Sequence, residues 1–353
     1  MKDLRQRIGR IVLGYTNKER PVTCEDIKAA GAMAAILRDA IKPNLFQTME
    51  HTPCLVHTEV SENISIDSGS IVADRIALGL CNYVIAEAGC GADTGAEKFF
   101  DIKCRVSGLK PDVCVIVCTA RALKMHSGDF EVTPGEPLPK EMLHENISAI
   151  ERGFCNLEKQ IENLKVFGVP VVVCINRFSA DTEKEISVIK RRLRNLGVNG
   201  VVVSDAWSTG GLGCTELAGS VIEACKVKSN FRFLYPLDLP IKDKIKRIAK
   251  TIYGAKEVVF SDQANKKTLL FKKLKLDNVP VCIVKTPLSL SHSPKRKGRP
   301  HGFKLPVEDM AIYNGAGYLS IFCGNVETMP ALPRIPLGTK VNVDDEGRIT
   351  GLL

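Results

Sequence analysis

Charged and aromatic residues directly follow three short apolar runs of this sequence. Arg121 and Lys124 follow the run VCVIVCTA, Phe178 ends the run PVVVCINRF, and Trp207, the single tryptophan of the chain, ends the run GVVVSDAW. Paired cationic side chains can bind a phosphate-bearing ligand, and two aromatic rings can enclose a flat heterocycle by offset stacking. These residues therefore predict a site for a planar, anionic small molecule.

Each of these residues also has a structural interpretation. Arg121 and Lys124 would suit the solvated start of a helix, and core packing explains most aromatic side chains such as Phe178. Trp207 lies instead among Ser, Asp, Thr and Gly. Polar and glycine-rich neighbours do not favour core packing, so for Trp207 we favour a role in binding.

A glycine-rich turn follows a fourth apolar run, YVIAEA at residues 83–88. Gly89 and Gly91 would let backbone N–H groups approach an anion at the start of the next helix. Glu87 and Asp93 flank the turn and could hold a cation or hydrogen-bond a ligand. A plain strand-to-helix turn with capping carboxylates explains the same residues, and the spacing fits neither the dinucleotide-binding pattern nor the Walker A pattern.

The apolar runs that precede these residues alternate with amphipathic helical stretches. The runs predicted to form strands are 83–88, 113–120, 170–178 and 200–207. They are continuous, as expected of strands buried on both faces, and helical spacing predicts helices at 141–167 and 183–196. This order predicts a parallel sheet with helices on both faces. Ligands of such sheets bind beyond the carboxyl ends of the strands, where the candidate residues lie.

Two helices are expected before this region. Apolar residues from Leu4 to Val12 recur at helical spacing, and a second helix is expected at about 24–40. Thr23 and Asp26 form a variant of the capping box at the predicted start of the second helix.

The pattern changes near residue 230. Helices expected near 240–253 and 262–274 bracket the short apolar runs EVVF and VCIVKT. A chain of 353 residues exceeds the size at which one hydrophobic core usually stops growing. We therefore predict a parallel α/β domain at 1–229 and a smaller α+β domain at 230–353.

Composition restricts the function class. The net charge of +9 favours an anionic partner, but 40 acidic residues are interspersed with 49 basic ones, which favours small anions over nucleic acid. The thirteen cysteines include no pair with metal-ligand spacing, which predicts reduced thiols and no metal site. The first residues predict neither a signal peptide nor a membrane helix. We expect a cytoplasmic protein without a membrane partner.

A basic loop occurs in the stretch SHSPKRKGRPHGF. It holds Lys295, Arg296, Lys297 and Arg299. Solvated loop charge is the commonest explanation for such a short run, and nuclear localisation or contact with RNA are alternatives. The tail of a polyglutamylated folate would also suit it.

Several motifs together resemble one family. The motifs are AEAGCGADTGAEKFFDIKCR, VCTARALKMHSG, FGVPVVVCINRF, TIYGAKEV and TMPALPRIP. They are similar to formate–tetrahydrofolate ligase, also called 10-formyltetrahydrofolate synthetase. The resemblance covers essentially the whole chain, and the block RALKMH is specific to that family.

This resemblance implies an activity and a fold. Family members ligate formate to tetrahydrofolate at the expense of ATP with Mg²⁺. The reaction passes through formyl phosphate, which N10 of tetrahydrofolate attacks. The implied fold is an α/β domain of the P-loop NTPase type with smaller appended domains, assembled as a homo-oligomer.

The resemblance also implies roles for individual residues. Phe178 and Trp207 match the aromatic pair that brackets the pterin ring, and Arg121 and Lys124 match the basic signature and are expected to be catalytic. The residues expected in the nucleotide and formyl phosphate loops are Asn63, Ser70, Glu87, Gly89, Gly91 and Asp93.

The sequence departs from the family in three places. Family chains begin with a further segment that carries a Walker A loop, and no GxxxxGK[ST] pattern occurs here. Without such a loop, the charge that develops in phosphoryl transfer lacks its usual stabiliser. We therefore expect a truncated product, a fragment that pairs with another chain, or a decayed paralogue.

The other departures lie in the predicted ligand loops. HTEVSENISIDSGS stands where the family reads close to HGGPFANIAHGCNS, which adds the carboxylates of Glu59, Glu62 and Asp67 near an anionic intermediate and disfavours it. Ser179 replaces a proline after Phe178 and should loosen that loop. Two hypotheses follow: an enzyme of the ligase family, or a catalytically impaired paralogue that binds folate or acts as an interaction subunit.

Overall fold

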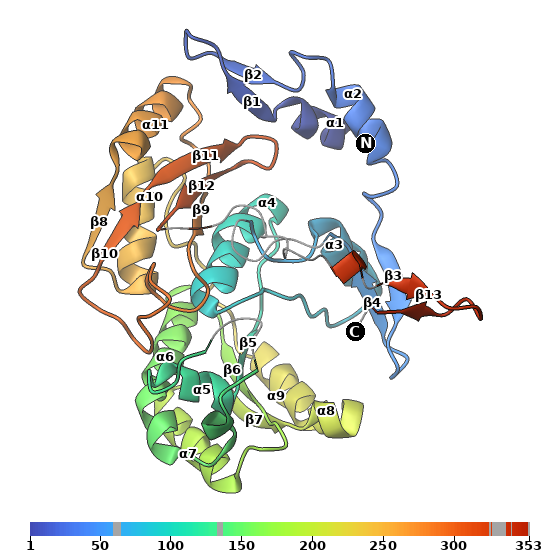
Figure 1. Cartoon of the computed structure of the whole chain (residues 1–353), viewed down its shortest axis with the longest axis vertical. Helices are drawn as coiled ribbons and strands as arrows, with labels where there is room; N and C mark the ends of the chain where they lie inside the picture. Colours follow the sequence, from blue (N-terminus) through green and yellow to red (C-terminus); the bar gives the residue numbers. More distant parts are fainter. Residues whose placement is uncertain (59–64, 133–136, 325, 327–336, 340, 352–353) are drawn as a thin grey trace.

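The structure is a computed structural model that describes residues 1–58, 65–132, 137–324, 326, 337–339 and 341–351. Two α/β units lie at opposite ends of the molecule, and an N-terminal arm runs along one side of both (Figure 1). A helical segment at residues 92–107 lies between the two units. This arrangement confirms the predicted mixed α/β class.

The unit that holds the candidate residues is built on a parallel sheet. Its strands are β5 (Cys114–Cys118), β6 (Val171–Asn176) and β7 (Gly200–Ser204), paired in the order β5-β6-β7. The central strand β6 is buried from Val171 to Ile175, which explains its continuous apolar sequence. The predicted parallel sheet is therefore confirmed for these three runs.

Helices cover both faces of this sheet (Figure 1). The helices of this unit are α5 (Ala120–His126), α6 (Ile147–Val166), α7 (Glu183–Leu193), α8 (Ala206–Thr209) and α9 (Thr215–Cys225), with the 3₁₀ turns η3 (Lys140–Leu143), η4 (Arg194–Leu196) and η5 (Gly210–Cys214). Helix α6 buries Ile150 and Phe154 completely against the sheet. Helix α7 begins with a capping box in which Thr182 and Glu185 exchange hydrogen bonds.

The second unit contains mixed sheets. Its elements are α10 (Ile241–Ile248), the π-helix η6 (Ala249–Tyr253), β8 (Glu257–Phe260), α11 (Asp262–Lys273), β9 (Val281–Val284), β10 (Lys304–Val307), β11 (Asp309–Tyr313) and β12 (Tyr318–Phe322). Strands β8 and β10 are parallel, and β11 joins the parallel pair β12 and β9 in antiparallel orientation. One buried apolar cluster extends from Ala96 to Cys323 and includes residues of both units. The boundary at residues 229 and 230 stays a prediction.

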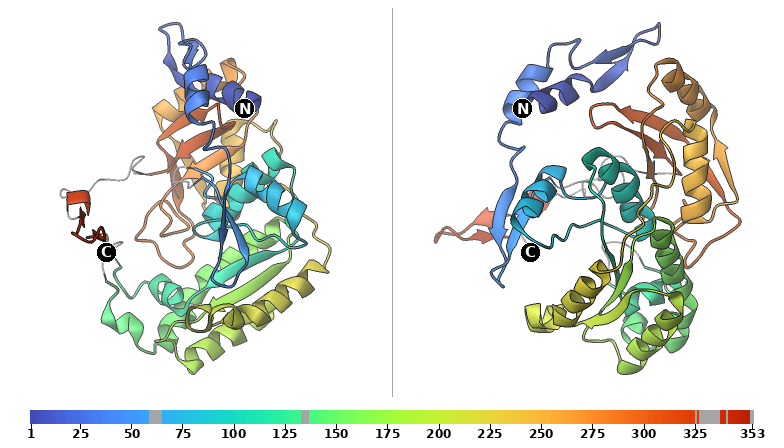
Figure 2. Two further views of the ribbon diagram at one scale, coloured as in Figure 1. Left: turned by 90° about the vertical axis from the view of Figure 1, so that its right-hand side faces the viewer. Right: turned by 180° about the vertical axis from the view of Figure 1, so that it is seen from behind.

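The N-terminal arm consists of small elements. They are α1 (Lys2–Gly9), β1 (Val12–Tyr15), β2 (Pro21–Thr23), α2 (Ala30–Ile36), β3 (Asn44–Gln47), β4 (Pro53–Val56) and α3 (Ile71–Leu80). An ion pair of 2.7 Å between Lys273 Nζ and a Glu19 carboxylate oxygen links the β1–β2 turn to α11. At the other end of the chain, η7 (Leu337–Thr339) precedes a hairpin of β13 (Asn342–Val343) and β14 (Ile349–Thr350) that projects from the molecule (Figure 2).

Two predicted elements of this arm and its neighbourhood differ in the structure. The helix expected at 24–40 is confirmed only for Ala30–Ile36. Thr23 and Asp26 exchange the expected hydrogen bonds, but Lys28 adopts a φ of +60°, which interrupts the helical conformation before Ala30. The run at 83–88 is not a strand. Tyr83 and Ile85 are largely exposed, and in the described residues this run makes only one isolated bridge, from Ala88 to Ser68.

The helical segment between the units buries many charges. It comprises the π-helices η1 (Ala92–Ala96) and η2 (Phe99–Cys104) and the short helix α4 (Arg105–Ser107). Lys103 pairs with Asp74 at 2.8 Å and Arg105 with Asp101 at 3.0 Å. Glu97, by contrast, is fully buried, and neither of its carboxylate oxygens has a hydrogen-bond partner among the described residues. Burial, then the nearby Asp101, raises the pKa of Glu97 well above its ordinary value of 4.5.

A raised pKa at Glu97 predicts how the free energy of unfolding depends on pH. A carboxyl that keeps its proton in the folded state contributes stability below its unfolded pKa, and this stability is lost as the pH rises towards the folded pKa. We expect Glu97→Gln, which cannot ionise, to flatten the loss of stability above pH 4.5. Urea unfolding of both proteins between pH 5 and 9 measures this, and parallel pH profiles would contradict it.

Candidate functional site

Arg121 and Phe178 form a contact at the carboxyl edge of the parallel sheet. Thr119 caps α5 by accepting a hydrogen bond from Ala122 N at 3.0 Å, which places Arg121 in the first turn after β5. The Arg121 guanidinium carbon lies 3.9 Å from the centre of the Phe178 ring. Such stacking uses the flat face of the guanidinium and leaves its N–H edge for an anion. Arg121 Nε is buried without a hydrogen-bond partner among the described residues.

Hydrogen bonds fix the loop that carries Phe178. Phe178 N donates to the Asp181 carboxylate at 2.9 Å, and Arg177 N donates to Ser204 O at 3.1 Å. The Arg177 side chain pairs with Glu183 at 3.0 Å and more distantly with Asp205 at 3.7 Å. These contacts tie the ends of β6 and β7 together. They also hold the backbone beside Ser179, at the position where the resembled family has a proline.

Trp207 lies on α8, directly after β7. Its side chain is 93% exposed, and among the described residues no ring contact joins it to Phe178. The structure thus places the two aromatic residues after neighbouring strands, as the sequence predicted, without bringing the rings together. An exposed indole is available to contact a flat ligand directly.

Lys124 lies apart from the contact between Arg121 and Phe178, in a buried salt bridge. Its side chain is 1% exposed and pairs with Glu185 at 2.6 Å. Its amino group also donates to the carbonyls of Met142 at 3.1 Å and His144 at 2.8 Å. An ammonium group has three protons, so these contacts use all of its donors. A catalytic role for Lys124 stays a prediction that its burial does not favour.

The glycine turn is closely packed. Gly89 N donates to Asp67 O at 2.9 Å, and a Cβ on Gly89 would lie 2.1 Å from an Asp67 carboxylate oxygen. A Cβ on Gly95 would lie 1.7 Å from Gly89 O. These close approaches explain the glycines sterically. The Asp67 carboxylate fills the space in front of the turn, which leaves no room for an anion there.

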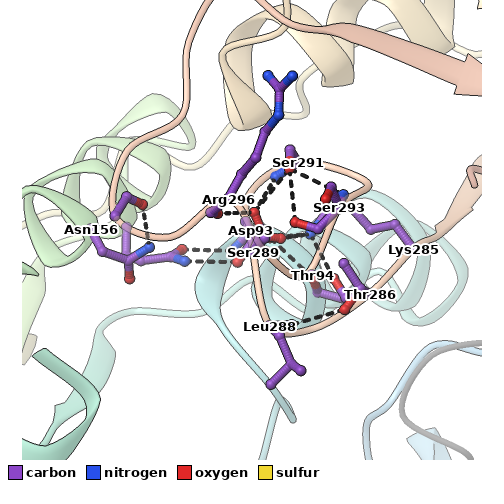
Figure 3. A network of polar contacts seen from close by, with 12 residues as sticks. Asp93, Thr94, Asn156, Lys285, Thr286, Leu288, Ser289, Ser291, Ser293 and Arg296 are labelled. Carbon is purple, nitrogen blue, oxygen red and sulfur yellow. Dashed lines mark hydrogen bonds and ion pairs between the residues drawn. The ribbon is translucent and has the colours of Figure 1, made fainter. Parts of the chain in front are cut away.

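Asp93 belongs to a buried polar network (Figure 3), and Gly91 lies close to it. An Asp93 carboxylate oxygen lies 2.7 Å from Lys285 Nζ, and Gln160 donates to the other oxygen at 2.7 Å. A Cβ on Gly91 would lie 2.6 Å from that same Asp93 oxygen. Burial by itself would raise the pKa of Asp93, but the charge of Lys285 and the hydrogen bonds lower it below its ordinary value. Both carboxylate oxygens of Asp93 therefore have partners within the protein, which leaves neither of them free for a cation.

The remaining predicted loop residues have local contacts. Ser70 caps α3 by accepting from Ala73 N at 3.0 Å and lies 2.6 Å from His57 Nδ1. Glu87 is exposed, and its carbonyl accepts a hydrogen bond from Ser68 Oγ at 3.0 Å. Asn63, together with Glu59 and Glu62, lies outside the described residues. Ligand roles for Asn63, Ser70 and Glu87 stay predictions.

The basic loop is held against α6. Arg299 makes two hydrogen bonds of 2.8 Å with the Glu162 carboxylate, and Asn156 Nδ2 donates to Gly298 O at 2.9 Å. Gly298 N lies 3.3 Å from His126 Nδ1. Sequence reasoning missed Lys285, which anchors the start of this loop. Its one signal was a lysine at the end of an apolar strand, VCIVK, where burial requires a partner.

Comparison with known proteins shows similarity along the whole chain. The family model described as formate–tetrahydrofolate ligase matches residues 1–353. The formate–tetrahydrofolate ligase of Desulforamulus reducens is 46% identical over 352 residues, which are 100% of this chain and 62% of that protein. The cytoplasmic C-1-tetrahydrofolate synthase of Homo sapiens is 47% identical over 349 residues, and the mitochondrial one of Saccharomyces cerevisiae is 46% identical over 367 residues.

The matched length differs between these proteins. The chain spans 62% of the Desulforamulus ligase, 37% of the human synthase and 38% of the yeast synthase. Within the part of the chain that the structure describes, no helix combines the length and apolar character needed to cross a membrane.

The Lys124–Glu185 pair predicts the effect of a substitution. Lys124→Met should destabilise the protein by about 3–5 kcal/mol, because it leaves the Glu185 carboxylate buried without its charge partner. The double variant Lys124→Met with Glu185→Gln should regain part of this loss, because the amide leaves no buried charge and its oxygen can still accept one of the backbone hydrogen bonds of Glu185. Denaturant unfolding of the three proteins measures the coupling. A single variant as stable as the parent would show that Lys124 is not part of the folded core.

Proposed function

Because this chain belongs to the formate–tetrahydrofolate ligase family, we propose that it binds tetrahydrofolate and takes part in its ATP-dependent ligation to formate, which yields 10-formyltetrahydrofolate. The observation that best supports this proposal is the stacking of Arg121 on Phe178 at the edge of the sheet, with Trp207 after the next strand. This edge is where ligands of parallel sheets bind.

The proposed roles follow from these contacts. Phe178 and Trp207 enclose the pterin ring, which requires the exposed indole to move over its ligand. Arg121 offers N–H groups to an anion, and in the ligase reaction that anion is formyl phosphate. We assign Lys124 to positioning, since its salt bridge with Glu185 fixes α5, and with it Arg121, against α7.

The glycine turn does not fit the phosphates of ATP. A polyphosphate needs exposed N–H groups and positive charge, whereas the Asp67 carboxylate lies against Gly89 and Lys285 neutralises Asp93. We therefore derive no step at Gly89 or Gly91. ATP and its Mg²⁺ would need phosphate-binding groups from another chain segment.

Strand β5, at the edge of the parallel sheet, suggests that a further segment covers it. Strand β5 pairs with β6 on one side, and no described strand pairs with its other side. Val115 and Val117 on β5 are 37% and 63% exposed. An exposed apolar edge tends to pair with another strand. We propose that a further segment, in this chain or another, covers β5 in the active assembly, and that an uncovered chain forms homo-oligomers.

A catalytically impaired folate-binding protein is the second candidate function. The carboxylate of Asp67 over the glycine turn supports it, because like charge disfavours an acyl phosphate. Folate binding at Phe178 and Trp207 does not depend on that turn. For both functions we keep a cytoplasmic location as part of the proposal.

Tetrahydrofolate titration tests the shared part of both functions. Binding should quench the fluorescence of Trp207, the single tryptophan. Phe178→Ala should weaken binding about tenfold, because stacking on one aromatic ring contributes roughly 1–3 kcal/mol. Trp207→Phe removes the signal, and Tyr15→Ala, a partly exposed aromatic on β1, is the matched control.

Turnover with ATP and formate on the same samples separates the two functions. Product formation supports the ligase, and binding without turnover supports the impaired paralogue. Absence of tetrahydrofolate binding to the unchanged chain would exclude both.

A substitution on β5 tests the proposed covering segment. Val117→Lys should reduce self-association, because an edge lysine opposes strand pairing. Sedimentation velocity of both proteins measures this, and Val106→Lys, at an exposed valine of α4, controls for added charge. If the unchanged chain is a monodisperse monomer that unfolds cooperatively, the edge needs no cover.

A further inference from the structure

We infer that Glu50 is a positioning residue that holds the loop carrying Trp207. Its side chain lies at the tip of the β3–β4 hairpin, far along the chain from that loop. One Glu50 carboxylate oxygen accepts a hydrogen bond from Gly211 N at 2.8 Å. The use of this loop for a folate ligand rests on the proposed function, whereas its fixation by Glu50 does not.

The hairpin tip presents Glu50 on a closed turn. Thr48 N donates to Thr52 O at 2.9 Å, and Thr52 N donates to Thr48 Oγ1 at 3.1 Å. His51 N donates to Thr48 O at 2.9 Å, and its φ of +61° lets the chain reverse. The hairpin extends towards α8 (Figure 1). The backbone around Glu50 is therefore held by three hydrogen bonds of its own.

The loop is shaped to receive this carboxylate. Gly210 has a φ of +62° and a ψ of −144°, a conformation that is essentially restricted to glycine. A Cβ on Gly210 would lie 2.7 Å from the Glu50 oxygen, and one on Gly211 would lie 3.0 Å from its carboxylate carbon. Side chains at either position would block the approach. The two glycines therefore allow both the turn and the contact.

The loop has few other anchors. Trp207 and Leu212 are 93% and 84% exposed, so neither packs in the core. Ser208 N and Thr209 N both donate to Asp205 O within the loop at 3.0 Å. Among the hydrogen bonds described for residues 206–213, the one to Glu50 is the one that reaches a distant part of the chain. A charged acceptor makes this bond stronger than a neutral one.

This contact gives the hairpin a role in ligand binding. A loop that moves freely must be ordered when the indole closes over a flat ligand, which costs conformational entropy. Glu50 reduces that cost by fixing the backbone four residues after Trp207. The carboxylate acts through the loop and not on the ligand.

Fluorescence anisotropy of Trp207 in the ligand-free protein tests the fixation. Glu50→Ala should lower the anisotropy, because the indole then follows a more mobile loop. Glu50→Gln should retain most of it, since its amide oxygen can accept the same N–H. Glu216→Ala, at an exposed glutamate on α9, should leave it unchanged. Equal anisotropy in the unchanged chain and Glu50→Ala would overturn the inference.

Tetrahydrofolate affinity tests the consequence. Glu50→Ala should bind about threefold more weakly, within the range of one lost hydrogen bond, and Glu50→Gln should bind almost as tightly as the unchanged chain. Lower anisotropy with unchanged affinity would overturn the role in ligand binding. If the unchanged chain does not bind tetrahydrofolate, the proposed function fails, and the anisotropy result alone decides whether Glu50 fixes the loop.

Discussion

The buried ion pair of Asp93 and Lys285 is the constraint on which the packing of the two units depends. The two side chains are 5% and 0% exposed. A buried charge pair is tolerated only when its remaining hydrogen bonds are also satisfied. Gln160 supplies one on α6, and Lys285 also donates to Ser289 O at 2.7 Å. These hydrogen bonds join three distant parts of the chain, and one apolar core likewise includes residues of both units.

Pairing in buried salt bridges also limits which charged side chains are available to a ligand. Lys124 and Glu185 form a second buried pair, and Glu185 also accepts a hydrogen bond from Asn146 N at 2.8 Å, at the start of α6. Both pairs use side chains that look like ligand-binding groups in the sequence. Arg121 differs because its guanidinium stacks on a ring and has no carboxylate partner among the described residues. The proposed site therefore consists of one cation and two aromatic residues, and the two buried ion pairs are not among its proposed ligand contacts.

The sequence predicted those elements whose pattern reflects their burial. Strand β6 is apolar without interruption because it is central, and α6 shows helical spacing because one face is buried. The run at 83–88 is also rich in apolar residues, but it has no neighbouring strand among the described residues, which the local sequence cannot reveal. The π-helices at Ala92–Ala96 and Phe99–Cys104 bury Asp93 and Lys103, whose charge partners Lys285 and Asp74 no local rule predicts. The burial of Lys124 could not be predicted from the sequence, because its partner Glu185 is adjacent only in the fold.

The contact between Asp67 and Gly89 also depends on the backbone conformation of Asp67. Asp67 has a φ of +53°, a left-handed conformation that favours glycine, and the family resemblance places a glycine at this position. The backbone of Asp67 thus has a conformation that suits glycine, while its side chain fills the space in front of the turn. A glycine at this position would fit the same backbone and remove the carboxylate from Gly89.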